Sequence, residues 1–392
     1  MKKILFVIPS LTAGGAERSL INLLCEMPRD KYEIDLLLFK MKGAFLSQVP
    51  SNVNIIDQPY KLKKIYGPAK NGGVYGAIKI VSNVISKIVK RGMGNQKAFL
   101  WKHFYNHIID KMEKEYDVAV GYLGGESTYY VVDKVNAVRK IHWIHSDYNM
   151  NGMPKWFDKD MFKKLDAIVT ISEECLSIVK KEFPEHAYKC YFVPNITSSS
   201  TIEKLSNMYE PMEYEGKKNI FLSVGRLSKE KGFDIAVDAA SILKETELEF
   251  YWFIIGDGKL KKELKNQIEK YGLEENVFLL GIKENPYPYI KNCNVFVQPS
   301  RYEGKSVAID EAKILNKVIV ATHYNTVADQ ITNDIDGVVV DIDSKSLANG
   351  LIELSNNEDK MKNIMNNLSK NEYGNQHEIK KCIDVIEGNI LN

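Results

Sequence analysis

A repeating rhythm of apolar and polar segments constrains the fold of this chain most strongly. Short apolar runs alternate with turns rich in Gly, Ser or Asn and with segments whose apolar residues recur at helical spacing. Such alternation is typical of parallel sheets joined by helical crossovers. The candidate strands are KILFVI, EIDLLLF, NVNII, YDVAVGY, RKIHWI, DAIVT and KCYFV in the first half, and NIFLSV, EFYWFII, NVFLL, NVFVQP, KVIVA and DGVVV in the second. The sequence therefore predicts an α/β fold with doubly wound sheets.

The chain length indicates two domains. A single hydrophobic core rarely grows beyond about 250–300 residues, and this chain has 392. A polar stretch without regular apolar spacing separates the two sets of strands. We therefore expect an N-terminal domain at 1–195, a linker at 196–218, a C-terminal domain at 219–370 and an amphipathic helix at 371–392 that packs back toward the N-terminal domain.

Composition and charge exclude several classes of protein. Hydrophobic residues make up 44% and charged residues 27%, which are ordinary values for a folded globular chain. The net charge of +2 argues against a nucleic-acid-binding protein. The five cysteines are scattered without a C-x-x-C pair, as in proteins of a reducing compartment, and no run reaches the ~18 apolar residues of a membrane span. We expect a cytoplasmic protein.

One segment departs from this neutral average. Residues 61–102 contain ten Lys or Arg residues and no Asp or Glu. Apolar residues recur within it at helical spacing, at Ile78, Val81, Ile85, Ile88 and Val89. A basic amphipathic helix can lie on an anionic membrane surface, which would place the protein peripherally at the inner face of the cell membrane. It can equally turn its apolar side to the core and leave a basic side in solvent. The sequence leaves both interpretations open.

The first strand leads into a turn that contains two glycines. The stretch LTAGGAER places Gly14 and Gly15 just before a helix, where backbone N–H groups can approach an anion. It lacks the G-x-G-x-x-G pattern of dinucleotide-binding folds, which argues against a dehydrogenase. Because tight turns between strands and helices also use glycine for steric reasons, this turn alone is weak support for a ligand site.

His145 follows the strand RKIHWI, at the point where the strand ends. In open α/β sheets, ligands bind beyond the carboxyl ends of the strands, so His145 is a candidate for ligand contact. His142 lies inside the same strand and is more consistent with a packed side chain. A single His at a strand end does not establish a site by itself.

A basic turn opens the second set of strands. The stretch SVGRLSKEKG carries Gly225, Arg226 and Lys231 between a strand and a helix. A guanidinium group, an ammonium group and a helix N-terminus together suit a phosphate or a diphosphate, since Arg is a forked donor and Lys a compact charge. The alternative is a solvated basic loop without a ligand.

The stretch RYEGKSVAIDEAK follows another strand of the same domain. Glu303 and Gly304 precede a helix for which Ser306 is a credible N-cap, and Glu311 lies more than one turn inside it. Gly304 permits close backbone approach, and the first N–H groups of the helix are donors for phosphate oxygens. Two carboxylates and several N–H donors at one edge of a sheet suit a nucleotide sugar, which combines hydroxyls with a diphosphate.

In order and spacing, these motifs together resemble those of the family 4 glycosyltransferases. The resemblance rests on the Gly-Gly turn, the His after a middle strand, G-R-x4-K, and E-x7-E with a glycine after the first Glu. It spans nearly the whole chain. It implies the GT-B fold, in which two Rossmann-like doubly wound domains face each other across a cleft. It also implies a retaining transferase that moves a hexose-type sugar from a nucleotide-diphosphate sugar and needs no divalent metal or other cofactor.

The resemblance also implies roles for individual residues. Arg226 and Lys231 would hold the donor diphosphate and stabilise it as it leaves, Glu303 would accept hydrogen bonds from the donor sugar, and His145 would lie near that sugar. Glu311 would bind the ribose. The backbone around other positions would complete the donor site, at Gly14, Gly15, Gly225, Gly281, Ile282, Gly304, Lys305, Ser306 and Val307. A UDP-sugar is the expected donor, and a lipid-linked polysaccharide precursor such as that of a capsule is the expected acceptor.

Three departures from the family pattern affect the donor more than the fold. Lys305 and Ser306 stand where an apolar residue and a Gly or Pro are usual, which indicates a more polar sugar pocket. Asn316 takes the place of the glycine that ends the helix, and Asn is the next most tolerant residue for a left-handed cap.

Two other functions remain as alternatives: a nucleotide-sugar 2-epimerase of the same fold, and a non-catalytic partner subunit. Acceptor specificity is expected in residues 121–128 and 61–102.

Overall fold

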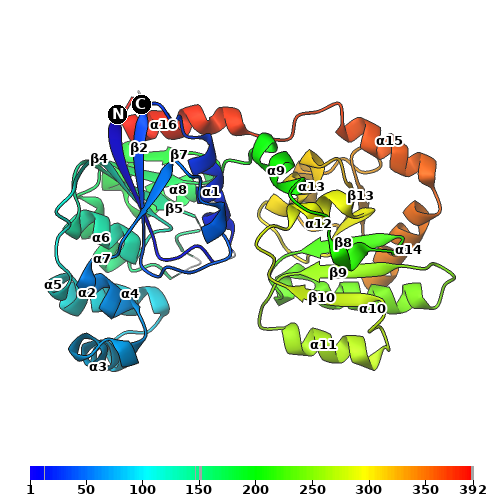
Figure 1. Ribbon diagram of the computed structural model, residues 1–392, viewed down its shortest axis with the longest axis horizontal. Coiled ribbons are helices and arrows are strands. Elements are labelled where there is room, and N and C mark those ends of the chain that lie inside the picture. The colour runs from blue at the N-terminus through cyan, green and yellow to red at the C-terminus, as the bar shows by residue number, and fades with distance from the viewer. Residues whose placement is uncertain (13, 146, 150–151, 390–392) are drawn as a thin grey trace. The chain divides into compact units, whose positions relative to one another are not determined.

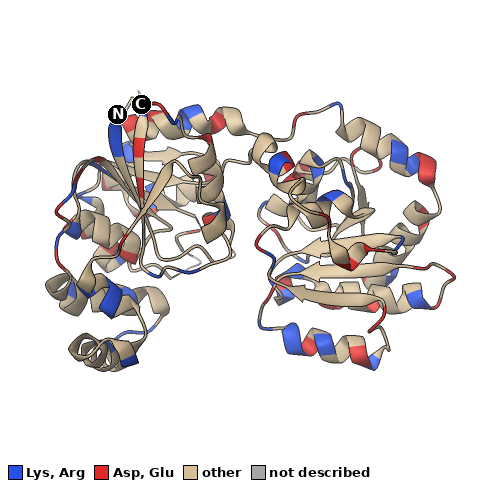
Figure 2. Cartoon of the chain, in the orientation of Figure 1, with Lys and Arg blue, Asp and Glu red and all other residues tan. Residues whose placement is uncertain are grey.

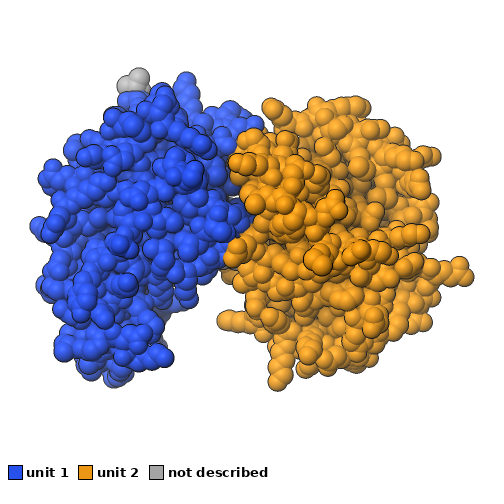
Figure 3. Space-filling view, in the orientation of Figure 1, with its two compact units in different colours: residues 1–196, 376–392 blue, residues 197–375 orange. Residues whose placement is uncertain are grey.

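The computed structural model describes residues 1–12, 14–145, 147–149 and 152–389, and its chain divides into two compact units. Unit 1 contains residues 1–196 and 376–392, and unit 2 contains residues 197–375 (Figure 3). The chain therefore passes between the units at two places. Figure 1 labels the elements of both units, each of which has a central sheet with helices on its two faces.

Unit 1 is built on a seven-stranded parallel sheet with the order β3-β2-β1-β4-β5-β6-β7. Its strands are β1 (Lys2–Ile8), β2 (Tyr32–Leu38), β3 (Val53–Ile56), β4 (Glu115–Tyr122), β5 (Asn136–Ile144), β6 (Ala167–Thr170) and β7 (Cys190–Phe192). Its helices are α1 (Gly15–Glu26), α2 (Tyr60–Tyr66), α3 (Val74–Val89), α4 (Met93–Leu100), α5 (Asn106–Ile108), α6 (Glu126–Lys134), α7 (Lys155–Phe162), α8 (Glu173–Glu182) and α16 (Ile379–Glu387).

Unit 2 is built on a six-stranded parallel sheet with the order β10-β9-β8-β11-β12-β13. Its strands are β8 (Ile220–Val224), β9 (Tyr251–Ile255), β10 (Val277–Gly281), β11 (Val295–Gln298), β12 (Val318–Thr322) and β13 (Val338–Val340). Its helices are α9 (Ser199–Ser206), α10 (Phe233–Lys244), α11 (Lys261–Lys270), α12 (Tyr287–Asn292), α13 (Val307–Ile314), α14 (Ser344–Ser355) and α15 (Glu358–Leu368). The doubly wound α/β fold predicted from the sequence is confirmed.

Each sheet separates two apolar cores. Successive side chains of a strand point to opposite faces, so Leu5 and Val7 of β1 pack in one core of unit 1, whereas Ile4 and Phe6 pack in the other. Strands buried on both faces need apolar residues at every position. Figure 2 shows the result in unit 2, where charges lie on the helices and loops and β8, β9 and β10 carry none.

The segment predicted as a linker contains structure of its own. Within residues 196–218, helix α9 begins after the N-cap Ser198, whose hydroxyl accepts a hydrogen bond from the N–H of Thr201. Ile202 of this helix is fully buried in a core of unit 2. Helix α9 contacts α12 and α13, and the buried side chain of Ile202 stabilises this packing.

The last helix of the chain belongs to unit 1. Cys382, Val385 and Ile386 of α16 are buried in the same core as β1 and α1. The hydroxyl of Tyr32 donates to Glu387 over 2.6 Å, and the Arg139 side chain donates to the carbonyl of Val385. Helix α16 therefore completes an apolar core that residues 1–196 alone leave uncovered.

Candidate active site

The candidate donor site lies at the carboxyl edge of the sheet in unit 2. Strands β8 and β11 are neighbours in this sheet, although two strands separate them in the sequence. The connections from β8 and β11 turn away in opposite directions, and ligands of open α/β sheets bind at such switch points. The loop after β8 carries Arg226 and Lys231, and the loop after β11 carries Glu303. The sheet thus brings the two predicted motifs to one place.

Glycines allow the backbones of these loops to lie in close contact. Gly232 has a φ of 65°, and a Cβ there would lie 1.9 Å from the carbonyl oxygen of Pro299. A Cβ on Gly256, after β9, would lie 1.8 Å from the carbonyl oxygen of Gly225. Both positions therefore need glycine for space, and Gly232 needs it for its left-handed backbone as well. A Cβ on Gly225 would lie 3.3 Å from the ring of Phe233, so this position also leaves little room for a side chain.

Glu303 is buried, and one of its carboxylate oxygens is held by three donors. Oε1 accepts from Lys231 Nζ at 2.6 Å, from Gln298 Nε2 at 2.7 Å and from Ser300 Oγ at 2.7 Å. Charge-assisted bonds of this length are among the stronger ones in proteins. Among the described residues no hydrogen bond to Oε2 is found. Glu303 is therefore fixed in orientation through one oxygen while the other can accept a further hydrogen bond.

Two arginines near this edge have different roles. Arg301 forms a bidentate pair with Asp234, with both N–O distances at 2.6 Å, and so ties the loop after β11 to helix α10. Arg226 is exposed and makes no ion pair with any residue that the structure describes. A guanidinium without a carboxylate partner keeps its forked donors for an anionic ligand. Arg226 is thus the residue of this edge that suits a phosphate group.

The N-terminus of α13 differs from the sequence-based expectation. Ser306 stands at the N-cap position, but its side chain makes no capping bond. Its backbone N–H, predicted to assist a donor phosphate, donates instead to Gln330 Oε1 at 2.8 Å, and Gln330 Nε2 donates to Asp310. The first N–H groups of a helix lack partners within the helix, and a buried amide side chain satisfies this one. A phosphate would have to displace Gln330 to reach the Ser306 amide.

Lys305 forms an ion pair with the helix that follows it. Its ammonium group lies 3.0 Å from Oδ2 of Asp310, in the first turn of α13, and its side chain is 68% exposed. Gly304 is exposed, and a Cβ there would meet no atom within 4 Å. Val307 begins the helix.

The remaining predicted contacts of unit 2 lie at the same edge of the sheet. Glu311 is buried on α13, and the hydroxyl of Tyr287 donates to its Oε1 at 2.7 Å. Gly281 ends β10 with a φ of 69°, and its carbonyl accepts from the N–H of Gly256. Ile282 follows with half of its side chain exposed. Gly281 therefore needs its glycine for backbone conformation, whatever it binds.

His145 follows the end of β5 in unit 1 and is partly buried. Its ring packs on Tyr122 with 4.3 Å between centroids, and both ring nitrogens are buried without a partner among the described residues. Burial, with a smaller effect of His142, lowers the pKa of His145 to about 3, so the ring is neutral at pH 7. Leu123, next to Tyr122, has a φ of 80°, an uncommon conformation for a bulky residue that occurs most often at functional sites.

The glycine turn of unit 1 places Gly14 at the N-cap of α1 and Gly15 at its first position. Gly14 is extended, with a φ of −141°, so its backbone does not require glycine. A Cβ on Gly14 would lie 2.3 Å from the carboxylate of Glu17, which also accepts from the Thr12 hydroxyl. A carboxylate at a helix N-terminus satisfies the helix dipole. The turn therefore already holds one anion where a phosphate was expected.

Several residues of the site were missed from the sequence. Gln298 and Ser300 orient Glu303, and Gln330 occupies the amide at α13. The sequence did carry a signal for Gln298 and Ser300. Gln298 is a polar residue at the end of the apolar run NVFVQPS, and ligands of open α/β sheets bind beyond the carboxyl ends of the strands. Within the described part of the chain, no group of three or more His, Cys, Asp and Glu side chains is placed to hold a metal ion.

Comparisons with known proteins find similarity to glycosyltransferases. Residues 210–371 match the family model described as glycosyl transferases group 1. An uncharacterized glycosyltransferase of Methanocaldococcus jannaschii is 31% identical over 173 residues, which is 43% of this chain and 42% of that protein. The N-acetylgalactosamine-N,N'-diacetylbacillosaminyl-diphospho-undecaprenol 4-alpha-N-acetylgalactosaminyltransferase of Campylobacter jejuni is 26% identical over 375 residues, 94% of each chain.

The fold also matches solved structures along its full length. The crystal structure of HepE from Anabaena in complex with UDP-glucose covers 100% of both chains with a TM-score of 0.62 and 18% sequence identity. At that identity the likeness concerns the fold alone, which is the GT-B fold expected from the sequence motifs. The chain therefore has the GT-B fold, and its residues 210–371 are similar to the glycosyl transferases group 1.

Proposed function

We propose that the chain is a retaining glycosyltransferase that moves a hexose-type sugar from a UDP-sugar to a lipid-linked glycan. The Campylobacter jejuni relative, similar over 94% of its length, is named for transfer to a sugar linked to diphospho-undecaprenol. A second relative, from Escherichia coli, is named for galactose transfer from UDP-galactose to a GlcNAc-diphosphoundecaprenol. The Anabaena structure of the same fold holds UDP-glucose. These names support both the donor class and the acceptor class.

One observation carries the proposal. At the switch point between β8 and β11, Arg226 lacks an ion pair among the described residues, while Lys231 and Glu303 are fixed 2.6 Å apart. Negative charge develops on the diphosphate as the bond to the sugar breaks. Arg226 as a fork and Lys231 as a compact charge would stabilise it, and preorganised charges of this kind usually make the largest contribution to catalysis.

Glu303 would act on the sugar rather than on the diphosphate. Its Oε1 is held by Lys231, Gln298 and Ser300, so the second oxygen keeps a fixed direction toward hydroxyl donors. A donor that loses a hydroxyl at this point would leave a buried carboxylate oxygen without a partner, which disfavours binding. We propose Glu311 for the ribose and His145 for a further sugar contact, because the neutral ring can accept or donate a hydrogen bond.

We further propose that residues 61–102 hold the protein at an anionic membrane surface, where a lipid-linked acceptor resides. Helix α3 buries only Gly76, Ser82 and Ser86, whereas Val81 is 57% exposed and Ile88 79% exposed. Ile78 and Ile85 are partly buried, so the side of the helix that faces the protein carries both small polar and apolar residues. Exposed apolar residues beside lysines suit an interface of acyl chains and anionic headgroups. No helix of the described residues has the length and hydropathy to span a bilayer.

Turnover of a panel of UDP-sugars tests the proposed donor site. Arg226→Ala and Glu303→Ala should each lower the rate of transfer or donor hydrolysis by about 10²–10³-fold, the loss typical for one donor of a charge-stabilising site. Lys229→Ala removes a lysine from the same loop whose ammonium group has no ion pair among the described residues, and it should retain activity. Circular dichroism would show that the variants fold. Undiminished turnover in both site variants would exclude the assignment.

A further inference from the structure

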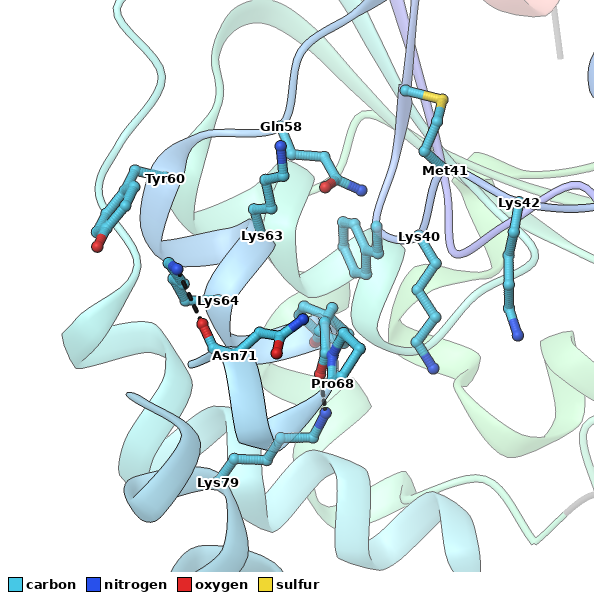
Figure 4. Close-up of a pocket in the computed structure, with 13 residues that line it drawn as sticks. Lys40, Met41, Lys42, Gln58, Tyr60, Lys63, Lys64, Pro68, Asn71 and Lys79 are labelled. Carbon is cyan, nitrogen blue, oxygen red and sulfur yellow. Dashed lines mark hydrogen bonds between the residues drawn. The ribbon is translucent and has the colours of Figure 1, made fainter. Parts of the chain in front are cut away.

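A pocket of unit 1 is lined by residues that are not among those assigned to the donor. Its volume is about 750 Å³, and it opens where the chain leaves the carboxyl end of β2. The segment Phe39–Lys42 forms one wall, helix α2 and the turn that follows it form another, and Lys79 of α3 closes a third side (Figure 4). Pockets of this size hold small organic ligands or their charged groups.

Lysines dominate the lining of this pocket, which we call the lysine pocket. It is lined by Lys40, Lys42, Lys63, Lys64 and Lys79, and no Asp or Glu lines it. None of these five forms an ion pair with another described residue, in contrast to nearby Lys61, which lies 2.7 Å from Asp110. Five ammonium groups without ion pairs around one cavity repel one another, and this repulsion is relieved by an anion.

The five lysines fall into two groups. Lys64 donates to the carbonyl of Asn71 and Lys79 to the carbonyl of Gly67, so these two are held in place by the backbone. Burial, and then the neighbouring charge of Lys40, lower the pKa of Lys79. For Lys40, Lys42 and Lys63, no side-chain hydrogen bond is found among the described residues, and Figure 4 shows that they project from two different walls. The pocket thus combines fixed and adjustable cations, which suits a ligand with several anionic oxygens.

We propose that the lysine pocket binds the diphosphate group of a lipid-linked acceptor. This assignment rests on the proposed function for its choice of acceptor, but the affinity for a diphosphate follows from the pocket alone. Ammonium groups are compact charges that bind phosphate oxygens without the planar geometry that carboxylates favour. A diphosphate offers two adjacent charges, and the paired arrangement of lysines on two walls can contact both.

Apolar side chains of the pocket itself indicate that the diphosphate is attached to a lipid. Met41 and Tyr60 line the pocket together with the lysines and are 46% and 66% exposed. A lipid diphosphate joins an anionic group directly to an apolar chain, so the pocket offers contacts for both parts. Inorganic diphosphate has no apolar chain to cover these residues. The juxtaposition therefore favours the lipid-linked form.

The pocket and His145 lie at the same edge of the sheet in unit 1. The pocket begins after β2 and His145 follows β5, with β1 and β4 between these strands. Three strand spacings amount to about 14 Å. An acceptor held by its diphosphate would therefore reach His145 through sugar residues that cross the ends of β1 and β4. The geometry points to an acceptor that already carries sugars on its lipid diphosphate.

A pair of matched variants tests the proposal by calorimetric titration with inorganic diphosphate. The pocket variant changes Lys40, Lys42 and Lys63 to Gln, and the control variant changes Lys70, Lys87 and Arg91 to Gln. Both remove three exposed charges from the same region, and only the first set lines the pocket. Saturating UDP is present throughout to fill the donor site. The pocket variant should bind diphosphate about ten-fold more weakly or worse, since it loses charge-assisted contacts, and the control should bind as the parent protein does.

Sedimentation with vesicles separates the lipid from its headgroup. Vesicles of phosphatidylglycerol with and without a polyprenyl diphosphate are compared for the parent protein and both variants. The proposal expects the parent and control to prefer the vesicles that contain the diphosphate lipid and the pocket variant to lose this preference. Equal losses in both variants would show a diffuse charge effect and would overturn the proposal, as would diphosphate binding that the pocket variant retains. Hydrolysis of UDP-sugars reports on the proposed transferase function separately, so either idea can fail alone.

Discussion

Substitution of Gly232 by Ala gives the sharpest test of how the donor site is built. A Cβ at this position would lie 1.9 Å from the carbonyl oxygen of Pro299, and the backbone has a φ of 65°. Gly216 in the same unit has a φ of 71°, but a Cβ there would meet no atom within 4 Å. The two substitutions share the left-handed backbone and differ in the clash, so their difference isolates the contact with Pro299.

The expected magnitudes follow from these two contributions. An Ala in the left-handed conformation destabilises the folded state by about 1–2 kcal/mol. Replacing Gly by Ala also lowers the entropy of the unfolded chain, which offsets about 0.4–1 kcal/mol of this loss. Gly216→Ala should therefore lower the free energy of unfolding by about 1 kcal/mol or less. Gly232→Ala adds the displacement of Pro299, comparable to overpacking at about 1–3 kcal/mol, for a total near 2–4 kcal/mol. In a unit of this size, the additional 1–3 kcal/mol corresponds to roughly 2–12 °C in the melting temperature.

Function should follow stability at Gly232 but not at Gly216. Pro299 lies between Gln298 and Ser300, which both donate to Glu303 Oε1 at 2.7 Å. Moving the Pro299 carbonyl would shift both donors, so Gly232→Ala should also weaken UDP-sugar turnover. Thermal unfolding with and without UDP, together with the turnover assay, measures both effects. Equal melting temperatures and equal activities for the two variants would refute the reasoning.

Three further predictions concern other parts of the chain. Burial lowers the pKa of His142 and His145 to about 3 in the folded protein, so the unfolded chain binds more protons than the folded one below pH 6.5. The free energy of unfolding should therefore fall as the pH drops from 6.5 toward 3. Urea titrations should show a weaker dependence of this free energy on pH for the double His→Asn variant. Asn316 has a φ of 53°, so Asn316→Ala should lower the melting temperature by an amount equivalent to about 1 kcal/mol while Asn316→Gly should not; equal values would contradict the left-handed assignment. Val81→Ser with Ile88→Ser should reduce sedimentation with phosphatidylglycerol vesicles without lowering thermal stability, and unchanged sedimentation would count against the membrane proposal.

Local patterns in the sequence predicted most of the fold. The apolar runs correspond to the strands because a strand buried on both faces admits few polar residues. Asn316 was predicted as a left-handed cap, and its φ of 53° confirms this. Helix α9 was not predicted, because one buried apolar side chain, here Ile202, is enough to pack a polar segment against a core. A single buried residue produces no periodic pattern in the sequence.

The candidate site was predictable at the level of loops but not of contacts. Strand order brings Arg226, Lys231 and Glu303 to one edge, as motif order had indicated. The bond between Gln330 and the Ser306 amide joins residues that are 24 positions apart, so no local pattern reveals it. Helix α3 posed a different problem, because its pattern is compatible with either exposure of the apolar side. The burial of Gly76, Ser82 and Ser86 identifies the side of the helix that faces the protein.

The discontinuous build of unit 1 has a consequence for synthesis on the ribosome. Helix α16 supplies Cys382, Val385 and Ile386 to the core beneath β1, yet its residues emerge only after the whole of unit 2. Domains generally fold in the order of synthesis. In this chain, unit 2 can finish folding while unit 1 still exposes the apolar surface that α16 covers. The half of the protein that is synthesised first is therefore the one that completes its core last.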